Sequence, residues 1–363
     1  MQIGMPKESK VHEDRVSLVP DGVAELIRRG HEVVVEENAG QAIGFCNEDY
    51  RRAGATVGTR ERAFAAGLVV KVKEPSLDEC ALLTQDQVIF TYLHLAAMQA
   101  QARLMLASGC TAIAYETVED QRGCLPLLKP MSEIAGRMSI QVGAMALQSH
   151  ANGRGVLLSG VPGVAPGRVV VLGGGVAGSN AAEIAARLRA DVAILDRSPE
   201  RLAELETQFA GRARVLMASE ENLVHAVRSA DLVVGAVLIP GASAPKLIDR
   251  ERLKQMRRGA VLVDIAIDQG GCFASSRPTT HEQPTFVDEG VVHYCVSNMP
   301  GAVARTATEA LCRATLPYIC RLADKGLAKA VVDDPGFARG INVRAGQVVH
   351  PVVAQALGLA EAA

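Results

Sequence analysis

The sequence predicts an α/β fold made of two doubly wound, Rossmann-like domains, and three observations support this class. The chain has 363 residues, and domains of roughly 100–200 residues make two the expected number. Short Val, Ile and Leu runs alternate with helix-like stretches, as in parallel sheets covered on both faces. A glycine-rich strand–helix–strand unit lies near the middle of the chain.

The first third of the chain predicts four strands and an early helix. The helix is expected over 21–30 and ends on a glycine. The strands are expected within 31–40, where a turn follows, within 67–75, where Pro75 stops the strand, and within 87–97 and 111–118.

A long helix is predicted next, over 130–150, with Ser132 as its N-cap. A helix of this length could bridge two domains, and the Gly- and Pro-rich stretch 157–168 after it is expected to be a loop. A second strand–helix series then runs to about residue 301. From about residue 305 the pattern becomes helical, first over 307–326 and then in a shorter tail.

Composition excludes several classes of protein. The net charge of −2 gives no reason to expect nucleic acid or an anionic membrane as a partner. No apolar run reaches the roughly 18–20 residues that span a bilayer, and the first residues lack the order of a signal peptide. We therefore expect a cytoplasmic protein. The eight cysteines form no C-x-x-C pair, so we expect reduced thiols and no metal site.

The stretch 169–196 carries the motif with the clearest physical meaning. After the strand 169–172, Gly173, Gly175 and Gly178 occupy the three glycine positions of G-x-G-x-x-G. The first permits a tight turn, the second lets the backbone approach a pyrophosphate, and the third lets the helix pack closely on the strand. The start of the following helix offers free N–H groups to phosphates. The unit is therefore predicted to bind a dinucleotide.

Asp196 lies 23 residues after Gly173, at the end of the second strand of this unit. A carboxylate there can accept hydrogen bonds from ribose hydroxyls and would repel the 2′-phosphate of NADP, so NAD is the expected cofactor. Arg197 beside it could soften that repulsion.

Several polar residues have two interpretations on the residues alone. His94, in the apolar stretch FTYLHLAA, is either a core histidine or a proton-transfer group at the end of a buried strand. Arg15 is either a carboxylate-binding guanidinium or a surface arginine beside Glu13 and Asp14.

At two further places, two residues of the same type are candidates for one role. Lys71 and Lys73 share one parity of a predicted strand, and spacing cannot choose between them. Asp268 is expected to end the strand VLVDIAID, facing the ligand crevice, and Asp264 on the same parity competes with it.

Taken together, ten segments in order across nearly the whole chain resemble the alanine dehydrogenase family. They include GMPKESKVHEDRVSLVP, KVKEP, FTYLHLAA, PMSEIAGR, LGGGVAGSNAA, VDIAIDQGG and HYCVSNMPGAVART. The NAD-binding subunit of proton-translocating transhydrogenase shares the general layout. However, DIAIDQGG and HYCVSNMPGAV look closer to the dehydrogenase.

The resemblance implies a split domain order. A substrate domain is expected from 1–130 plus 305–363, and an NAD-binding domain from 131–304. The active site of the family lies in a cleft between the two domains, which long helices join, and its members are typically hexamers. The implied reaction is the reversible oxidative deamination of L-alanine to pyruvate and ammonium with NAD.

The resemblance also assigns roles to residues. Arg15 and Lys73 are expected to bind the substrate, and His94 and Asp268 to be catalytic, while Lys71 is interpreted as a solvated charge at a strand edge. The remaining expected contacts are to the cofactor: Ser132, Gly173, Gly175, Val176, Ala177, Gly178, Asp196, Arg201, Val237, Leu238, Ile265, Ala266, Ile267, Asp268, Arg277, Val296, Asn298 and Met299.

The chain departs from the family pattern at two positions. Ala304 and Ala307 stand where Pro and Ser are expected, which predicts a looser loop between the domains and one hydrogen bond fewer. Two rival functions are hydride transfer to the nicotinamide of a partner protein and NAD binding without catalysis.

Overall fold

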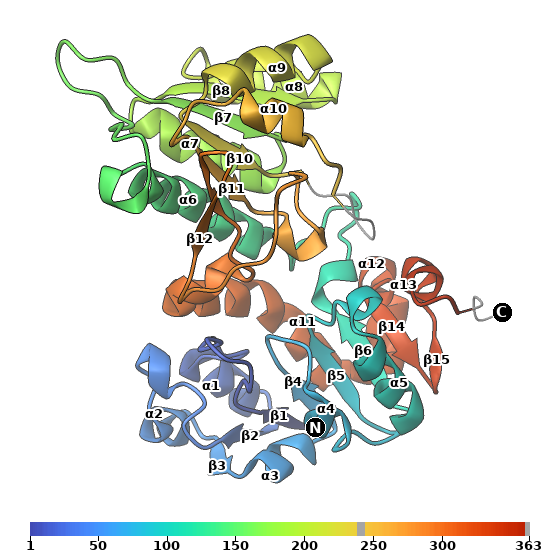
Figure 1. Cartoon of the computed structure of the whole chain (residues 1–363). Helices are drawn as coiled ribbons and strands as arrows, with labels where there is room; N and C mark the ends of the chain where they lie inside the picture. Colours follow the sequence, from blue (N-terminus) through green and yellow to red (C-terminus); the bar gives the residue numbers. More distant parts are fainter. Residues whose placement is uncertain (238–243, 360–363) are drawn as a thin grey trace. The chain divides into compact units, whose positions relative to one another are not determined.

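The structure is a computed structural model that describes residues 1–237 and 244–359 (Figure 1). The chain forms two compact units, the first from Met1–Met131 with Val303–Ala363 and the second from Ser132–Ala302. Each unit has its own mixed sheet dominated by parallel strands, so the predicted α/β class is confirmed.

The first unit contains an eight-stranded sheet with the order β15-β14-β6-β5-β4-β1-β2-β3. Six strands are parallel, and β14 and β15 add antiparallel pairs at one edge. The strands are β1 (Gln2–Met5), β2 (Glu32–Glu36), β3 (Thr56–Gly58), β4 (Leu68–Val70), β5 (Val88–Thr91), β6 (Thr111–Ala114), β14 (Ile341–Arg344) and β15 (Gln347–Val348).

Successive strand residues point to opposite faces of this sheet. Both faces are apolar, and helices cover each of them. Ile89 belongs to a core shared with residues of α5 and α13. Its neighbour Phe90 packs edge-on against Phe337 of α12, with ring centroids 5.7 Å apart. The helices of this unit are α1 (Pro20–Arg28), α2 (Asn47–Arg52), α3 (Arg60–Phe64), α4 (Leu77–Cys80), α5 (Gln99–Ser108), α11 (Ala304–Asp333), α12 (Pro335–Ala338) and α13 (Pro351–Ala356).

The second unit contains a seven-stranded sheet with the order β12-β13-β11-β10-β7-β8-β9, in which only β12 is antiparallel. The strands are β7 (Arg168–Leu172), β8 (Asp191–Asp196), β9 (Arg214–Met217), β10 (Leu232–Gly235), β11 (Val261–Asp264), β12 (Thr285–Asp288) and β13 (Val291–Tyr294).

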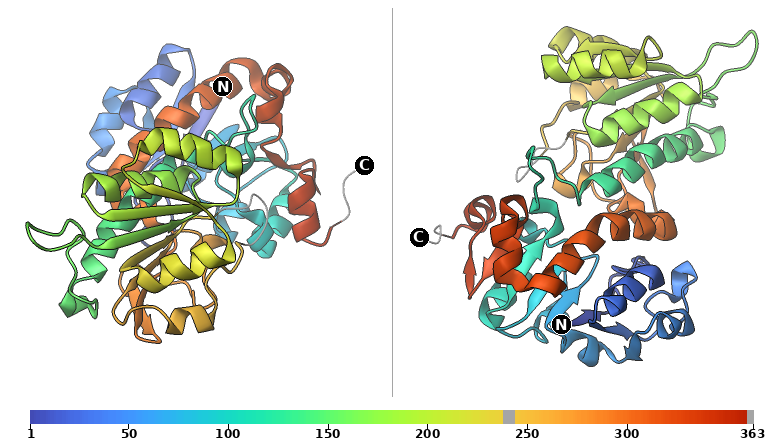
Figure 2. Two further views of the ribbon diagram at one scale, coloured as in Figure 1. Left: turned by 90° about the horizontal axis from the view of Figure 1, so that it is seen from above. Right: turned by 180° about the vertical axis from the view of Figure 1, so that it is seen from behind.

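Helices also lie on both faces of the second sheet (Figure 2). Val170 and Leu172 share a core with Leu223 of α9, whereas Val171 on the other face lies against Gly178 of α7. The helices are α6 (Lys129–Ala146), α7 (Val176–Arg187), α8 (Pro199–Phe209), α9 (Glu220–Ser229) and α10 (Arg250–Lys254).

Four expectations about elements need correction. The strands that were expected to include Lys73 and His94 end earlier, at Val70 and Thr91, and both residues lie in the loops that follow. The tail after α12 is not purely helical, since β14 and β15 extend the first sheet. Ser132 is not an N-cap, because α6 begins at Lys129.

The fourth correction concerns the two departures from the family pattern. Ala304 is the first residue of α11, and Ala307 is buried within the same helix. Ala304 therefore belongs to a helix and not to the loop that the sequence predicted, whereas Ala307 lies in the helix that was expected over 307–326. No described helix is long and apolar enough to cross a membrane. All eight cysteines are free thiols, and only Cys46 and Cys124 are exposed.

Candidate functional site

Both sheets have a point where the order of the strands reverses. Starting from β1 in the first unit and from β7 in the second, the chain builds strands first to one side and then to the other. In open α/β sheets of this kind, ligands bind beyond the carboxyl ends of the strands at this point. This rule points to the loops that follow β1 and β7 and their neighbouring strands.

In the first unit, the predicted substrate residues follow three neighbouring strands. Arg15 lies in the loop after β1, Lys73 follows β4, and His94 follows β5. Because β4 pairs with both β1 and β5, these three loops leave the same edge of the sheet.

Arg15 is buried, with 2% of its side chain exposed, and it forms a fork with Glu13. Nε donates to Oε1 at 2.6 Å, and an Nη donates to Oε2 at 2.5 Å. Burial works against the charged form, but the hydrogen bonds and charge of Glu13 hold the pKa of Arg15 above its ordinary value. The alternative of a surface arginine is wrong, and Arg15 is a fixed buried cation already facing a carboxylate.

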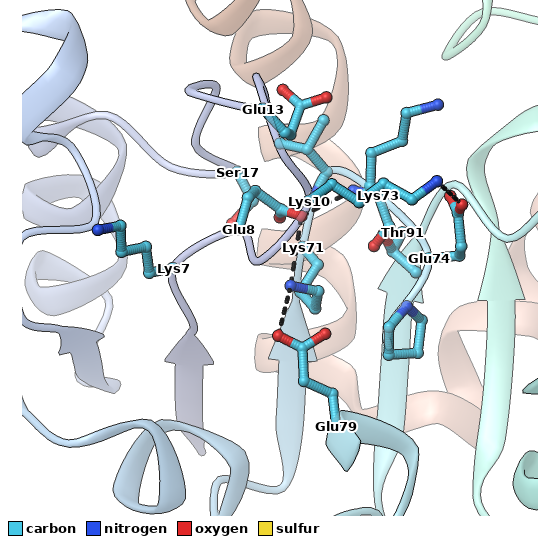
Figure 3. Close-up of polar contacts among 12 residues, drawn as sticks. Lys7, Glu8, Lys10, Glu13, Ser17, Lys71, Lys73, Glu74, Glu79 and Thr91 are labelled. Carbon is cyan, nitrogen blue, oxygen red and sulfur yellow. Dashed lines mark hydrogen bonds and ion pairs between the residues drawn. The ribbon is translucent and has the colours of Figure 1, made fainter. Parts of the chain in front are cut away.

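The prediction for Lys71 is also wrong, because this side chain is fully buried. It lies between Glu8 and Glu79 (Figure 3). Its Nζ lies 3.3 Å from Oε2 of Glu8 and 3.5 Å from Oε1 of Glu79. Both carboxylates are buried as well. A lysine at this depth requires such partners. Glu8 comes from a segment far from it in sequence, whereas Glu79 lies only eight residues further along the chain.

Lys73 is only partly buried, and its side chain extends away from Lys71 and Glu79 in Figure 3. Its backbone is held on both sides. Thr91 donates its hydroxyl to the Lys73 carbonyl at 2.9 Å, and the Lys73 amide donates to Glu8 at 3.3 Å. The structure thus separates two lysines that the spacing could not distinguish: one is a buried counter-ion and the other is accessible.

His94 has left-handed backbone geometry, with φ 48° and ψ 34°, three residues beyond the end of β5. This conformation is strained for a residue other than glycine. The Glu116 carboxylate stabilises it by accepting hydrogen bonds from the amides of Leu93, at 3.2 Å, and His94, at 2.6 Å. The His94 ring stacks on Tyr92, and the side chain is 38% exposed, so His94 is not a core histidine.

The glycine loop of the second unit has the geometry that its motif predicts. Gly173 has φ 96°, which a tight turn requires. A Cβ on Gly178 would lie 1.8 Å from the carbonyl oxygen of Gly173, so only glycine fits there. A Cβ on Gly175 would meet nothing within 4 Å, which leaves open space in front of the start of α7. The space at Gly175 and the free N–H groups of α7 fit a pyrophosphate.

Asp196 ends β8 and braces the glycine loop. Its Oδ2 accepts from the amide of Gly174 at 2.6 Å, and its Oδ1 accepts from the amide of Ser198 at 2.9 Å. Arg201 donates through Nε to the Gly174 carbonyl at 2.7 Å. The carboxylate thus lies beside the glycine loop, where a ribose acceptor is expected, while Arg197 is exposed.

The structure distinguishes Asp264 from Asp268 as well. The strand β11 ends at Asp264, so the expectation that Asp268 ends this strand is wrong. Asp264 is fully buried and accepts from Cys272, Ala266 and Ser276. Burial raises the pKa of Asp264 although these hydrogen bonds oppose it. Asp268 lies further on, in a short 3-10 turn over Ile267–Gln269, and is exposed.

The other expected cofactor contacts are spread over the second unit. Ser132 lies within α6, and Val176 and Ala177 lie in the first turn of α7. Arg277 stacks over the Phe286 ring, 4.3 Å from its centroid. Leu238 lies outside the described residues. The remaining contacts follow β10, β11 and β13 directly: Val237, Ile265, Ala266, Ile267, Val296, Asn298 and Met299.

Sequence reasoning missed Glu8, Glu13 and Glu116. Their only sequence signal is their place after β1 and β6, because a carboxylate that binds backbone amides belongs to no local motif. Among the described residues, no cluster of three or more His, Cys, Asp or Glu is arranged to hold a metal ion.

The chain is similar to known proteins over nearly its whole length. Family models described as "Alanine dehydrogenase/PNT" match residues 4–135 with the N-terminal domain and 139–351 with the C-terminal domain. The chain is 53% identical to an alanine dehydrogenase of Halomonas elongata over 361 residues, which cover 99% of this chain and 97% of the relative.

Two solved structures are similar across the chain. An L-alanine dehydrogenase matches with a TM-score of 0.95 and 51% identity, and the match covers 99% of both chains. A transhydrogenase from Sinorhizobium meliloti matches with a TM-score of 0.80 and 25% identity, covering 97% of this chain and 99% of the other.

Proposed function

We propose a function for a chain that belongs to the alanine dehydrogenase/PNT family: NAD-dependent, reversible oxidative deamination of L-alanine to pyruvate and ammonium. The observation that supports it best is the 53% identity to an alanine dehydrogenase over almost the full length of both chains. The transhydrogenase alternative is less well supported, since the identity to a transhydrogenase is only 25%.

In this proposal, one unit binds the substrate and the other binds the cofactor. The first unit is the substrate domain, because Arg15, Lys73 and His94 leave one edge of its sheet. The second unit binds NAD through the glycine loop, the start of α7 and Asp196. The nicotinamide of an NAD held there would supply the acceptor for the hydride from Cα of alanine.

The residues of the first unit bind and orient the substrate. Lys73 offers an accessible ammonium to the substrate carboxylate, and Arg15 adds a guanidinium whose position the Glu13 fork fixes. Because Glu13 already engages that fork, the substrate carboxylate binds Arg15 beside Glu13 or in its place.

Proton transfer then completes the reaction. Oxidation of the amine produces iminopyruvate, water adds to its imine carbon, and the carbinolamine releases ammonium to form pyruvate. His94, whose side chain is partly exposed and whose backbone Glu116 holds, accepts and returns the protons in this proposal. Asp268, whose carboxylate is exposed, orients the water or the amino group.

The direct test is NAD reduction, followed at the absorbance of NADH, with L-alanine and a panel of other amino acids. We expect activity with L-alanine and NAD, much weaker activity with NADP, and NADH oxidation with pyruvate plus ammonium. Activity only with another amino acid would refute the substrate, and hydride exchange between nicotinamides without alanine turnover would favour the transhydrogenase alternative.

The cellular location and the oligomeric state of the protein follow from the same family resemblance. We infer a cytoplasmic homo-hexamer, in line with the family resemblance, that acts on small molecules and needs no nucleic acid or membrane. Light scattering after size exclusion tests the assembly, and a monomeric active enzyme would refute it.

A further inference from the structure

Glu8 is a buried carboxylate that contacts the backbone carrying the predicted substrate lysine. Its Oε1 accepts from the amide of Val72 at 2.7 Å, and its Oε2 accepts from the amide of Lys73 at 3.3 Å. The same Oε2 lies 3.3 Å from Nζ of Lys71. Glu8 reaches this segment from the loop after β1, more than sixty positions away in sequence.

On its other side, the same segment is paired with the chain that leads to His94. Lys71 donates its amide to the carbonyl of Phe90, and Tyr92 donates its amide to the carbonyl of Val72, both at 3.2 Å. Residues 71–73 are therefore fixed between Glu8 and the end of β5, although β4 itself ends at Val70.

Lys71 supplies the charge that lets Glu8 remain buried, and Glu79 is its second partner. Glu79 also completes a capping box at the start of α4, where it accepts from the amide of Ser76 at 2.8 Å. Glu79 therefore shares the ion pair with Lys71 but has no hydrogen bond to the backbone of residues 72–73.

We propose that Glu8 is a positioning residue for substrate binding: it fixes the backbone of Val72 and Lys73, so that the Lys73 ammonium reaches the carboxylate of the amino-acid substrate. This inference rests on the proposed function. Glu8 acts through Lys73 and need not touch the substrate, whereas Lys71 acts as the counter-ion of Glu8.

Replacement of Glu8 by glutamine disturbs this arrangement without changing its shape. One terminal atom of glutamine is a donor. If the amide oxygen faces Lys73 and Lys71, the NH₂ group faces the N–H of Val72. If it faces Val72, the NH₂ group meets the N–H of Lys73 and the Lys71 ammonium. Either orientation sets donors against each other, and the backbone must shift.

The experiment compares Glu8→Gln with the matched control Glu79→Gln in the full-length enzyme. Both variants remove one carboxylate from Lys71, but only the first removes acceptors from Val72 and Lys73. We expect Glu8→Gln to raise KM for L-alanine and pyruvate about tenfold, with KM for NAD and kcat within about threefold. Glu79→Gln should leave each KM within about twofold, even if it lowers the Tm by as much as Glu8→Gln does.

A double-mutant cycle tests whether Glu8 acts through Lys73. In a Lys73→Ala background, Glu8→Gln should change KM for L-alanine by less than about twofold, because the group it positions is gone. An equal increase in both backgrounds would overturn the proposal, as would an unchanged KM in Glu8→Gln or an equal increase in Glu79→Gln.

Glu8→Asp covers the case in which Glu8→Gln does not fold. It keeps the charge beside Lys71 but is one methylene too short to reach both amides. A raised KM for L-alanine supports the proposal, and an unchanged KM overturns it. Failure of the unmodified enzyme to oxidise L-alanine is a separate result, which refutes the proposed function itself and with it this inference.

Discussion

Replacing Lys71 by methionine tests how strongly the buried ion pair stabilises the first unit. Lys71 and Glu79 are fully buried, and the Glu8 side chain is 3% exposed. Methionine fills a similar volume but leaves two buried carboxylates without a cation. Breaking a buried pair from one side costs about 3–5 kcal/mol. The first unit has about 190 residues, and at about 2–4 °C per kcal/mol the Tm should fall by about 6–20 °C.

The destabilisation should also depend on pH. Burial raises the pKa of Glu8 above 4.5, and Lys71 opposes this rise. Without Lys71 the pKa of Glu8 rises further, so the folded state holds a proton that the unfolded state releases above about pH 4.5. Stability of the variant therefore falls as the pH rises from that value through the folded pKa.

Thermal unfolding followed by circular dichroism at pH 5 and pH 8 measures both effects. We expect a larger Tm difference from the unmodified enzyme at pH 8. Lys7→Met is the control, because Lys7 is exposed on the same segment and its replacement should change stability by less than about 0.5 kcal/mol. A Lys71→Met variant that melts within 2 °C of the unmodified enzyme at both pH values would refute the reasoning.

Four further variants test the reaction and the cofactor site. His94→Ala should lower kcat with L-alanine by about 10²–10⁴-fold while NAD still binds, and near-normal turnover would contradict its role. Gly175→Ala should fold normally, because its Cβ meets no atom within 4 Å, yet weaken NAD binding at least about tenfold in a fluorescence titration. Gly178→Ala should instead lower the Tm, because its Cβ would lie 1.8 Å from the Gly173 oxygen; equal effects of the two glycine variants would contradict this division. Asp268→Asn should reduce kcat at least about tenfold with NAD affinity within about twofold, and loss of NAD binding would point to a structural role.

The parts of the molecule that depend on contiguous sequence were predicted well. The strand 169–172 is observed as β7 over Arg168–Leu172, and the helix after the glycines is α7. The alternation of strands and helices also predicted the α/β class. In these cases the residues that interact are close in the chain, so local spacing contains the information.

The ends of elements were predicted less well. Apolar residues continue past Val70, Thr91 and Asp264, so the pattern alone extends each strand too far. Just past these strand ends, the backbone amides of Val72, His94 and Ala266 bind carboxylates in place of strand partners.

The sequence by itself determined the α/β class, the glycine loop with Asp196 and, through ordered motifs, the family resemblance. Only the tertiary structure decided that Lys71 is a buried counter-ion and that Glu8 braces Lys73. It also showed that Glu116 holds the strained backbone of His94. Glu8 and Glu116 reach their partners from loops that meet at one edge of the sheet although they lie far apart in sequence, so no local pattern identifies these contacts.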